Sequence, residues 1–195
     1  MTSPVLIVVR HAPTASNGAH VFMGSADVPA TADGLRDAAS RAPVFRELGR
    51  EPVFASPLSR ATETARALFP DATVQVDSRL AERDLGEWAG QPQSQVRLEF
   101  AQAFRDTGVM DPRFTPPGGE ALETFETRIR SFLEDAVELC ETATPVAVSH
   151  NGWIRTAQYV LGLVEAEEIF AEGVPFLEPI HLDLRPLMAG RIASR

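Results

Sequence analysis

Five short runs of apolar, mostly β-branched residues recur along the chain and predict buried β-strands. They occupy residues 5–9, 52–55, 73–76, 146–149 and 180–184. The runs show little of the alternation that marks a strand with one solvated face. The pattern therefore predicts strands that are covered on both sides, as in a sheet between two layers of helices.

Between these runs, apolar residues recur at helical spacing. The first such segment follows Thr31, a favourable N-cap, and ends before Gly49, with Pro43 expected to kink it. Its apolar face comprises Leu35, Ala38, Ala39, Ala42, Phe45 and Leu48. A second, more regular face predicts a long helix packed on the sheet and comprises Leu122, Phe125, Ile129, Phe132, Ala136, Leu139 and Cys140.

Alternation of strands and helices predicts an α/β fold, a three-layer α/β/α arrangement with a mostly parallel central sheet. The length of 195 residues suits one large domain, and we expect residues 1–195 to form it. No repeat or interdomain linker interrupts the pattern. The Pro- and Gly-rich residues 111–119 are predicted to be a loop that closes over a neighbouring element.

Charge and composition limit the classes of partner. The chain has 27 acidic and 18 basic residues and a net charge of −9, so we expect no nucleic acid and no anionic membrane as a partner. Any anion site must be local. The single cysteine, Cys140, excludes an intramolecular disulfide and is expected in the core. The first apolar run is too short for a signal peptide or a membrane span, which favours a cytoplasmic location. Nothing in the pattern specifies an oligomer.

Ionisable side chains follow four of the predicted strands. Arg10 and His11 come directly after the first, Arg60 after the second, Glu82 after the third and His150 after the fourth. The carboxyl ends of parallel strands share one edge of a sheet, where α/β proteins bind ligands. A single histidine or arginine after a strand is structural or solvated more often than it is functional. Together, two arginines and two histidines would repel one another unless an anion lay between them, and phosphate is the natural candidate.

Two predicted helix starts strengthen the anion hypothesis. Ser56 and Pro57 fit an N-cap followed by the first helical residue, which places Arg60 in the first turn, where the helix dipole attracts anions. The alternative for Arg60 is an ion pair with Glu63 or Glu82. The second helix start comprises His150 and the amides of Asn151 and Gly152.

Six sequence blocks in chain order carry a family resemblance. They are Arg10-His11-x-x-Thr14-x-x-Asn17; Gly24-x-x-Asp27 with Thr31-x-x-Gly34; Ser56-Pro57-Leu58-x-Arg60-Ala61-x-x-Thr64-Ala65; Leu80-x-Glu82-x-x-x-Gly86-x-Trp88-x-Gly90; Pro117-Gly118-Gly119-Glu120; and Val148-Ser149-His150. The set resembles the histidine phosphatase superfamily, also called phosphoglycerate mutase-like. The resemblance spans most of the chain and implies the corresponding α/β fold and phosphoryl-transfer chemistry.

The resemblance also implies roles for individual residues. His11 would be the nucleophile that forms a phosphohistidine, with its ring oriented by a backbone carbonyl. Glu82 would protonate the leaving alkoxide and then activate water, which requires a carboxyl group that gains and loses a proton near neutral pH. No metal ion or other cofactor is expected, because cationic side chains stabilise the phosphoryl group. The residues expected to bind the substrate are Arg10, Asn17, Gly24, Arg60, His150 and Asn151.

Several neighbouring residues have alternative roles. Arg83 would oppose protonation of Glu82 if its side chain pointed inward. Trp88 either covers the site or, more simply, belongs to the core. Residues 97, 105 and 113 are arginines in the segment expected to cover the site, and they either contact a second anionic group or lie solvated on the surface.

The chain departs from the family pattern at four positions. Ala12 and Asn151 stand where glycine usually follows each histidine; Ala12 is tolerable if its φ is negative, and asparagine accepts a left-handed backbone. Ala121 replaces a helix-capping serine. Met23 replaces a polar residue, and a thioether cannot bind a carboxylate.

Met23 and the short segment 91–117 favour a phosphatase over a mutase, since a mutase needs a longer segment to enclose its substrate. The sequence therefore predicts a phosphoric monoester hydrolase acting on a small phosphorylated metabolite. Three alternatives remain open: phosphoglycerate mutase-type transfer, α-ribazole phosphatase-like activity, and a regulatory module that binds phosphate without turnover.

Overall fold

The central feature of the molecule is a five-stranded sheet with the strand order β3-β2-β4-β1-β5. The computed structural model describes residues 4–48 and 52–192. Four strands are parallel, and β5 pairs with β1 in the antiparallel direction. The strands are β1 (Val5–Arg10), β2 (Val53–Ala55), β3 (Val74–Val76), β4 (Val146–Ser149) and β5 (Pro179–Asp183). All five predicted strands are therefore present, within one or two residues at each end.

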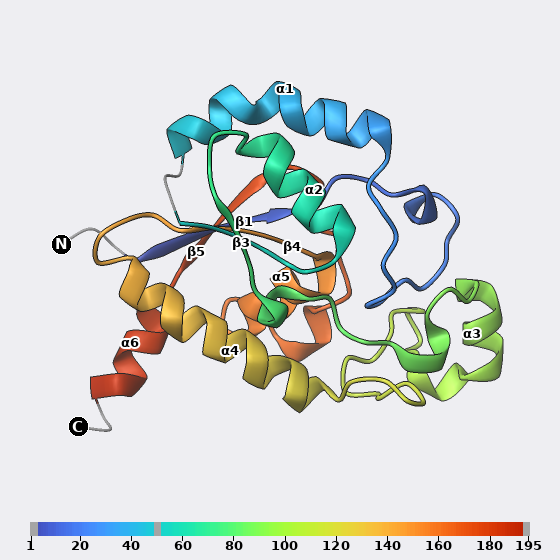
Figure 1. Ribbon diagram of the computed structural model, residues 1–195. Coiled ribbons are helices and arrows are strands. Elements are labelled where there is room, and N and C mark those ends of the chain that lie inside the picture. The colour runs from blue at the N-terminus through green and yellow to red at the C-terminus, as the bar shows by residue number, and fades with distance from the viewer. Residues whose placement is uncertain (1–3, 49–51, 193–195) are drawn as a thin grey trace.

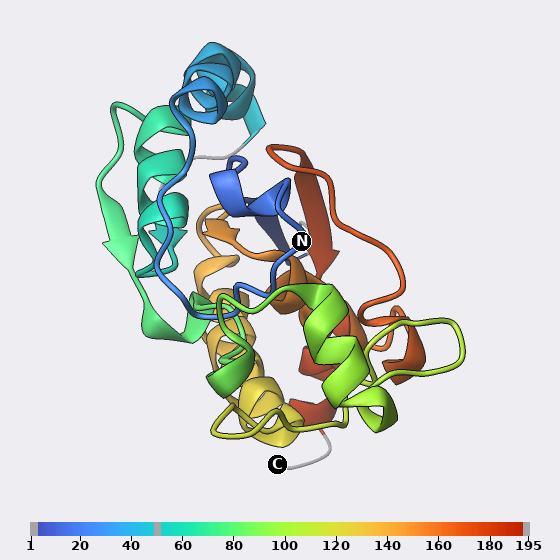
Figure 2. The same ribbon diagram turned by 90° about the vertical axis from the view of Figure 1, so that its right-hand side faces the viewer.

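Helices cover both faces of this sheet (Figures 1 and 2). In Figure 1, α1 and α2 lie above the sheet, α4, α5 and α6 lie below it, and α3 stands apart at one end. The helices are α1 (Ala32–Leu48), α2 (Ser59–Leu68), α3 (Gln93–Glu99), α4 (Leu122–Leu139), α5 (Asn151–Val160) and α6 (Arg185–Ile192). This arrangement confirms the predicted three-layer α/β/α fold. Among the described residues, no helix is long and apolar enough to cross a membrane.

Side-chain alternation along β1 divides the core into two halves. Leu6 and Val8 point to one face, where they pack with residues of α4 and α5. Ile7 and Val9 point to the other face and pack with residues of α1 and α2. All four side chains are at most 2% exposed, because β1 lies inside the sheet and has helices on both sides.

The two edge strands correct the expectation that every strand is buried on both faces. In β3, Gln75 and Val76 are exposed, and Val76 retains 56% of its accessible surface. In β5, His181 is exposed. An edge strand has a neighbouring strand on one side only, so some of its side chains stay exposed even though others, such as Leu182 of β5, reach the core. The sequence pattern does not distinguish such strands from central ones.

The capping prediction for α1 is confirmed, because the Thr31 hydroxyl accepts a hydrogen bond from Gly34 N–H at 3.1 Å. The helix continues through Pro43. Gly49 lies outside the described residues. At α4, the N-cap Ala121 makes no side-chain capping bond, as expected for alanine. Cys140 is half-buried rather than fully buried and packs against the α4–α5 core.

A separate cluster of aromatic residues forms the core of the part of the chain around α3. Trp88 is 1% exposed and stacks on Phe104 and Phe114, with Phe22 and Phe100 against its other edges. Trp88 is thus a core residue, which was the simpler of its two expected roles. The loop of residues 111–119 packs on this cluster through Phe114, so it closes over a neighbouring element as predicted.

Candidate active site

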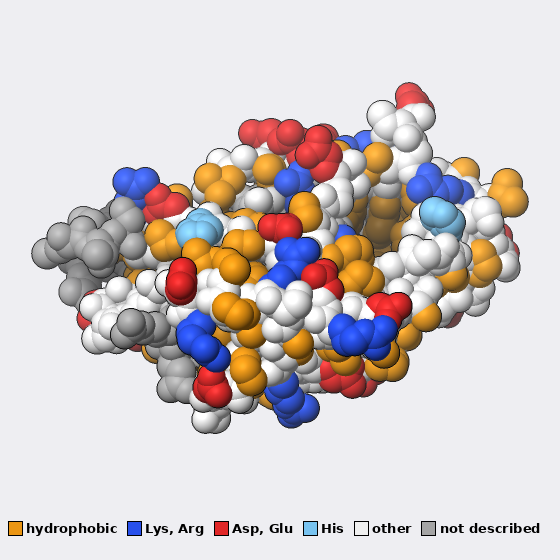
Figure 3. Space-filling view, turned by 90° about the horizontal axis from the view of Figure 1, so that it is seen from above, with side chains coloured by type: hydrophobic (Ala, Val, Ile, Leu, Met, Phe, Trp, Pro, Cys, Tyr) orange, Lys and Arg blue, Asp and Glu red, His pale blue; other side chains and the backbone are white. Residues whose placement is uncertain are grey.

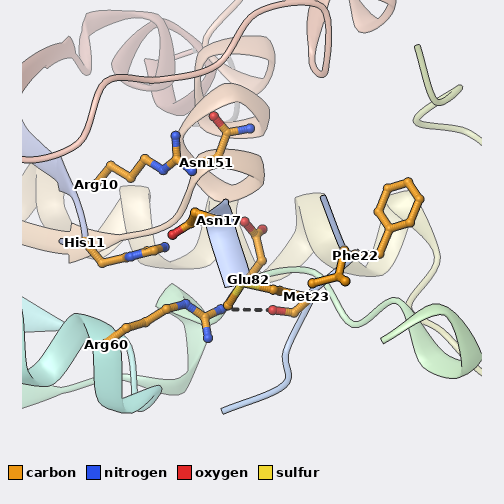
Figure 4. A pocket seen from close by; sticks show the side chains of 10 residues that line it. Arg10, His11, Asn17, Phe22, Met23, Arg60, Glu82 and Asn151 are labelled. Carbon is orange, nitrogen blue, oxygen red and sulfur yellow. Dashed lines mark hydrogen bonds between the residues drawn. The ribbon is translucent and has the colours of Figure 1, made fainter. Parts of the chain in front are cut away.

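A cavity of about 210 Å³ lies at the carboxyl ends of the parallel strands (Figure 4). The order β2-β4-β1 places the ends of these three strands side by side. The side chains that line the cavity are Arg10, His11, Asn17, Val21, Phe22, Met23, Gly24, Arg60, Glu82 and Asn151. The structure therefore brings together every predicted site residue except His150, which lies behind the wall.

The His11 ring is fixed by the backbone of its neighbour. Its Nδ1 lies 2.7 Å from the carbonyl oxygen of Ala12, and a carbonyl only accepts, so Nδ1 carries the proton. Burial, to which this carbonyl is opposed and to which the charges of Arg60 and Arg10 add, lowers the pKa of His11 to about 3. The ring is neutral at pH 7, and the lone pair on Nε2 is available for chemistry.

Arg10 lies beside His11 and has a buried donor with no protein partner. Its Nη1 donates to the carbonyl of Val174 at 2.6 Å, and the guanidinium stacks 3.7 Å from the Phe176 ring centroid. The buried Nε has no hydrogen-bond partner among the described residues. Burial lowers the pKa of Arg10 to about 10, partly offset by the charge of Glu82. A buried N–H without an acceptor favours binding of an anion at this position.

Arg60 is held by neutral acceptors and not by an acid. Its side chain is 1% exposed and donates to the carbonyls of Gly24 at 3.0 Å and Ala26 at 2.7 Å. The third bond runs from Nε to His150 Nδ1 at 3.2 Å. Burial lowers the pKa of Arg60. The predicted alternative, an ion pair with Glu63 or Glu82, is wrong, since no such pair forms. Three of the five N–H groups are engaged, which leaves two for a ligand.

The start of α2 differs from its prediction. The helix begins at Ser59 with Leu58 as N-cap, so Ser56 and Pro57 precede it. A residue distant in sequence supplies the cap, because Asp27 Oδ1 accepts from both the backbone N–H and the hydroxyl of Ser59 at 2.7 Å. Arg60 still falls in the first turn, as expected. Sequence reasoning missed this cap because Asp27 lies 32 residues away.

His150 lies beneath Arg60 and is fully buried. Its Nδ1 accepts from Arg60, so Nε2 carries the proton and donates to Ser56 Oγ at 2.7 Å. The ring centroid is 5.1 Å from that of His11. Burial lowers the pKa of His150 well below its usual value, and the neighbouring charges act in the same direction. In this arrangement His150 orients Arg60, while its direct contact with a phosphoryl oxygen stays a prediction.

The carboxylate of Glu82 is held by two backbone amides at the opposite wall of the cavity. Its Oε2 accepts from Gly152 N–H and its Oε1 from Arg83 N–H, both at 2.9 Å. The Gly152 amide, predicted to bind the anion, is therefore occupied by Glu82. A Cβ at Gly152 would lie 2.5 Å from Glu82 Oε1, so only glycine allows this contact. No sequence pattern indicates this pairing, because it depends on how α5 meets the segment after β3.

Arg83 points away from the cavity. It is 1% exposed, and its guanidinium donates to the carbonyls of Pro112, Phe114 and Glu120 at 2.8–3.0 Å. Burial lowers the pKa of Arg83. The concern that Arg83 opposes protonation of Glu82 from inside the site does not apply, since the side chain instead fixes the loop 111–119.

The two asparagines each use their carbonyl oxygen to hold a loop. Asn17 Oδ1 accepts from the backbone N–H of Thr14 at 2.7 Å and from its hydroxyl at 2.9 Å. Asn151 Oδ1 accepts from Val174 N–H at 2.7 Å. The amide nitrogen of each side chain is then the group available to a ligand. Asn151 is the first residue of α5 and does not have a positive φ, so this position does not need the left-handed backbone that asparagine accepts.

The other departures from the family pattern leave the cavity intact. Only His20 and Leu177 have a positive φ among the described non-glycine residues. The φ of Ala12 is therefore negative, and alanine is tolerated in place of glycine at this position. Met23 lines the cavity, and its sulfur lies 3.5 Å from the Thr14 hydroxyl.

The arginines of the covering segment are engaged elsewhere. Arg113 pairs with Glu167 at 2.6 Å, Arg105 donates to the Glu167 carbonyl at 2.6 Å, and Arg97, on α3, donates to the carbonyl of Gly108. None of the three lines the cavity. Arg97 and Arg113 are exposed, which agrees with the alternative role of surface residues, and Arg105 is half-buried.

Within the described part of the chain, no group of three or more His, Cys, Asp or Glu side chains is arranged to hold a metal ion.

Residues 6–173 match the family model of the histidine phosphatase superfamily, branch 1. The chain belongs to this superfamily. It is 34% identical to the fructose-2,6-bisphosphatase TIGAR of Bos taurus over 146 residues, which cover 71% of this chain and 53% of that protein. The match thus spans about half the length of TIGAR. The chain is also 25% identical to the 2,3-bisphosphoglycerate-dependent phosphoglycerate mutase of Rhizobium etli over 183 residues, 89% of this chain and 88% of the mutase.

Solved structures of the superfamily share the fold over nearly the whole chain. A mycobacterial glucosyl-3-phosphoglycerate phosphatase in complex with VO3 superimposes with a TM-score of 0.80 and 26% identity. The match covers 91% of this chain and 90% of the phosphatase. The superfamily thus includes proteins named as phosphatases and as mutases, and membership alone does not select between these reactions.

Proposed function

We propose that the chain is a phosphomonoesterase that hydrolyses a small phosphorylated metabolite, without a metal ion, through a phosphohistidine on His11. One observation carries the proposal: the neutral His11 ring is locked by Ala12, with Nε2 as its unprotonated nitrogen, beside the cations Arg10 and Arg60. Glu82 occupies the same cavity as the acid.

In the first step, His11 Nε2 attacks phosphorus and the ester P–O bond breaks. The leaving alkoxide takes a proton from the Glu82 carboxyl group. In the second step, the Glu82 carboxylate takes a proton from water, whose oxygen attacks phosphorus and breaks the P–N bond. Inorganic phosphate leaves, and His11 and the protonated Glu82 are restored.

Stabilisation of the phosphoryl group is assigned to the donors that the protein does not use. These are the Nε of Arg10, the two remaining N–H groups of Arg60 and the side-chain amides of Asn17 and Asn151. Such donors stabilise charge on the equatorial oxygens, which is the main contribution of a protein to phosphoryl transfer. His150 acts on this set through Arg60.

A mutase is the second candidate, because relatives carry that name. A phosphoglycerate mutase must bind the carboxylate of its substrate beside the phosphate. In this cavity the residues next to the phosphate region are Met23, Phe22 and Val21, and none of them binds a carboxylate. This composition supports hydrolysis over transfer. Ala12 and Asn151 fit the site without displacing its ionisable residues. This supports an active enzyme over a module that only binds phosphate.

The test is phosphate release from p-nitrophenyl phosphate by the wild type, with and without EDTA. We expect activity that survives EDTA, falls at least 10³-fold in His11→Ala and is unchanged in the matched control His181→Ala, whose histidine is exposed on β5. Equal activity in His11→Ala would overturn the proposal. Isomerisation of 3-phosphoglycerate with little phosphate release would select the mutase instead.

A further inference from the structure

A second cavity, of about 180 Å³, adjoins the phosphate cavity. The two cavities share Phe22, Gly24, Glu82 and Asn151 in their walls, so they lie side by side with Glu82 at the junction. The remaining wall of the second cavity consists of Arg83, Leu85, Met110, Gly152 and Phe170. Figure 3 shows a hollow with hydrophobic side chains inside it at the end of the molecule that carries α3.

The second cavity offers no cation to a ligand. Its one basic residue, Arg83, is 1% exposed and donates to three backbone carbonyls, so its guanidinium serves the loop 111–119. The acid at the junction, Glu82, brings no positive charge to the cavity. A carboxylate or second phosphate placed here would lose its water without gaining a partner.

The apolar wall is held in place before any ligand binds. Phe22 packs on Trp88 with ring centroids 5.5 Å apart and on Phe104 at 6.2 Å. Leu85 and Met110 belong to the same buried cluster and are 9% and 7% exposed. Phe170 packs against this cluster from the opposite side. A preformed apolar surface binds apolar groups with little ordering cost.

We infer that the second cavity receives the alcohol part of the substrate and selects an uncharged, apolar one. The inference rests on the proposed function, in which Glu82 protonates the oxygen between the two cavities. A dry apolar cavity of roughly 150 Å³ holds a benzene molecule, so about 180 Å³ suits a phenyl ring or a chain of about six carbons. Esters with a second anionic group are poor substrates.

The experiment compares two esters that differ only at the far end of the alcohol: hexyl phosphate and 6-phosphonooxyhexanoate. The leaving groups are equally basic at the scissile oxygen, so a difference in kcat/KM reports the second cavity. We expect hexyl phosphate to be better by at least tenfold. From ethyl to hexyl phosphate, kcat/KM should rise about fourfold per added methylene. Equal values for the two six-carbon esters, or a preference for the carboxylate, would overturn the inference.

Variants test whether this wall sets the preference. Phe170→Lys should raise kcat/KM for 6-phosphonooxyhexanoate and lower it for hexyl phosphate, because a half-buried position lets the ammonium reach the cavity edge. Met110→Ala, which adds no charge, should reduce the increase in kcat/KM that each added methylene of the substrate gives. The control Met188→Lys changes an exposed methionine on α6 and should alter neither ester. Thermal denaturation checks that each cavity variant is folded. If both folded variants keep the wild-type preference for hexyl phosphate, the inference is contradicted.

A binding measurement separates failure of this inference from failure of the proposed function. Calorimetric titration with hexylphosphonic acid and with 6-phosphonohexanoic acid requires no turnover. If the protein hydrolyses no ester but binds hexylphosphonic acid at least tenfold more tightly, the proposed function is refuted and the inferred preference of the second cavity for apolar groups is supported. Equal binding of both would refute the cavity's preference, whatever the turnover.

Discussion

The hydroxyl of Thr64 accepts a hydrogen bond from the backbone N–H of Ala12 at 2.9 Å and donates one to the carbonyl of Arg60 at 2.6 Å. Thr64 is fully buried on α2, and Ala12 follows β1. The contact holds Ala12, the residue whose carbonyl orients His11. One threonine thereby connects the nucleophile segment with the helix that carries Arg60.

Replacing Thr64 tests this connection. Thr64→Val keeps the shape but leaves the Ala12 N–H without an acceptor, so we expect kcat to fall about tenfold and the free energy of unfolding by about 1–3 kcal/mol. Thr64→Ser keeps the hydroxyl and should retain kcat within about threefold. Burst kinetics with p-nitrophenyl phosphate should show slower phosphoenzyme formation in the valine variant. A loss of stability with unchanged burst rate would limit Thr64 to a structural role.

Removing the acid at Glu82 should affect substrates unequally. Glu82→Gln cannot donate a proton to the leaving oxygen, and a poor leaving group needs that proton more. We expect kcat/KM to fall at least tenfold further for an alkyl phosphate than for p-nitrophenyl phosphate. Steady-state rates on both esters decide the matter. An equal loss on both would show that Glu82 is not the acid.

The buried histidines should make the fold sensitive to acid. Burial lowers the pKa of His150, and it lowers that of His11 to about 3. Below the ordinary histidine value of about 6.5, the unfolded chain therefore binds protons that the folded chain excludes. Stability is full above that pH and falls as pH decreases, by up to about 1.4 kcal/mol per pH unit for each histidine.

Urea unfolding at pH 7.5, 6.5 and 5.5 measures this slope. His150→Gln should be less stable at pH 7.5 but lose stability less steeply on acidification. His181→Ala, at an exposed site, is the control and should follow the wild type. The same pH slope in His150→Gln as in the wild type would contradict the prediction.

The turn at Gly86 should tolerate no side chain. Its φ is +52°, and a Cβ would lie 2.2 Å from the carbonyl oxygen of Pro117. Gly86→Ala should lower the free energy of unfolding by more than about 3 kcal/mol, through strain and steric overlap. Gly90 also has a positive φ, +81°, but no atom within 4 Å of a Cβ. Gly90→Ala should cost only about 1 kcal/mol, and equal losses in the two variants would disprove the steric explanation.

Several contacts of the site could not be predicted from the sequence. Asp27 caps α2, the Phe176 ring stacks on the Arg10 guanidinium, and the Gly152 amide holds the Glu82 carboxylate. These partners are 32, 166 and 70 residues apart in sequence. No local pattern encodes such pairs, because they depend on how helices and loops pack on the sheet. The exposed faces of β3 and β5 went unrecognised for the same reason.

The sequence by itself determined the strands, the layered α/β fold and the edge of the sheet at which His11, Arg10, Arg60 and Glu82 meet. It could do so because hydrophobic periodicity and the parallel order of strands fix where strand ends lie. Only the tertiary structure decided the orientation of each group. His150 lies behind Arg60, Arg83 points away from the cavity, and an apolar chamber adjoins Glu82. These features follow from burial, which makes each polar group find whichever partner the packing supplies.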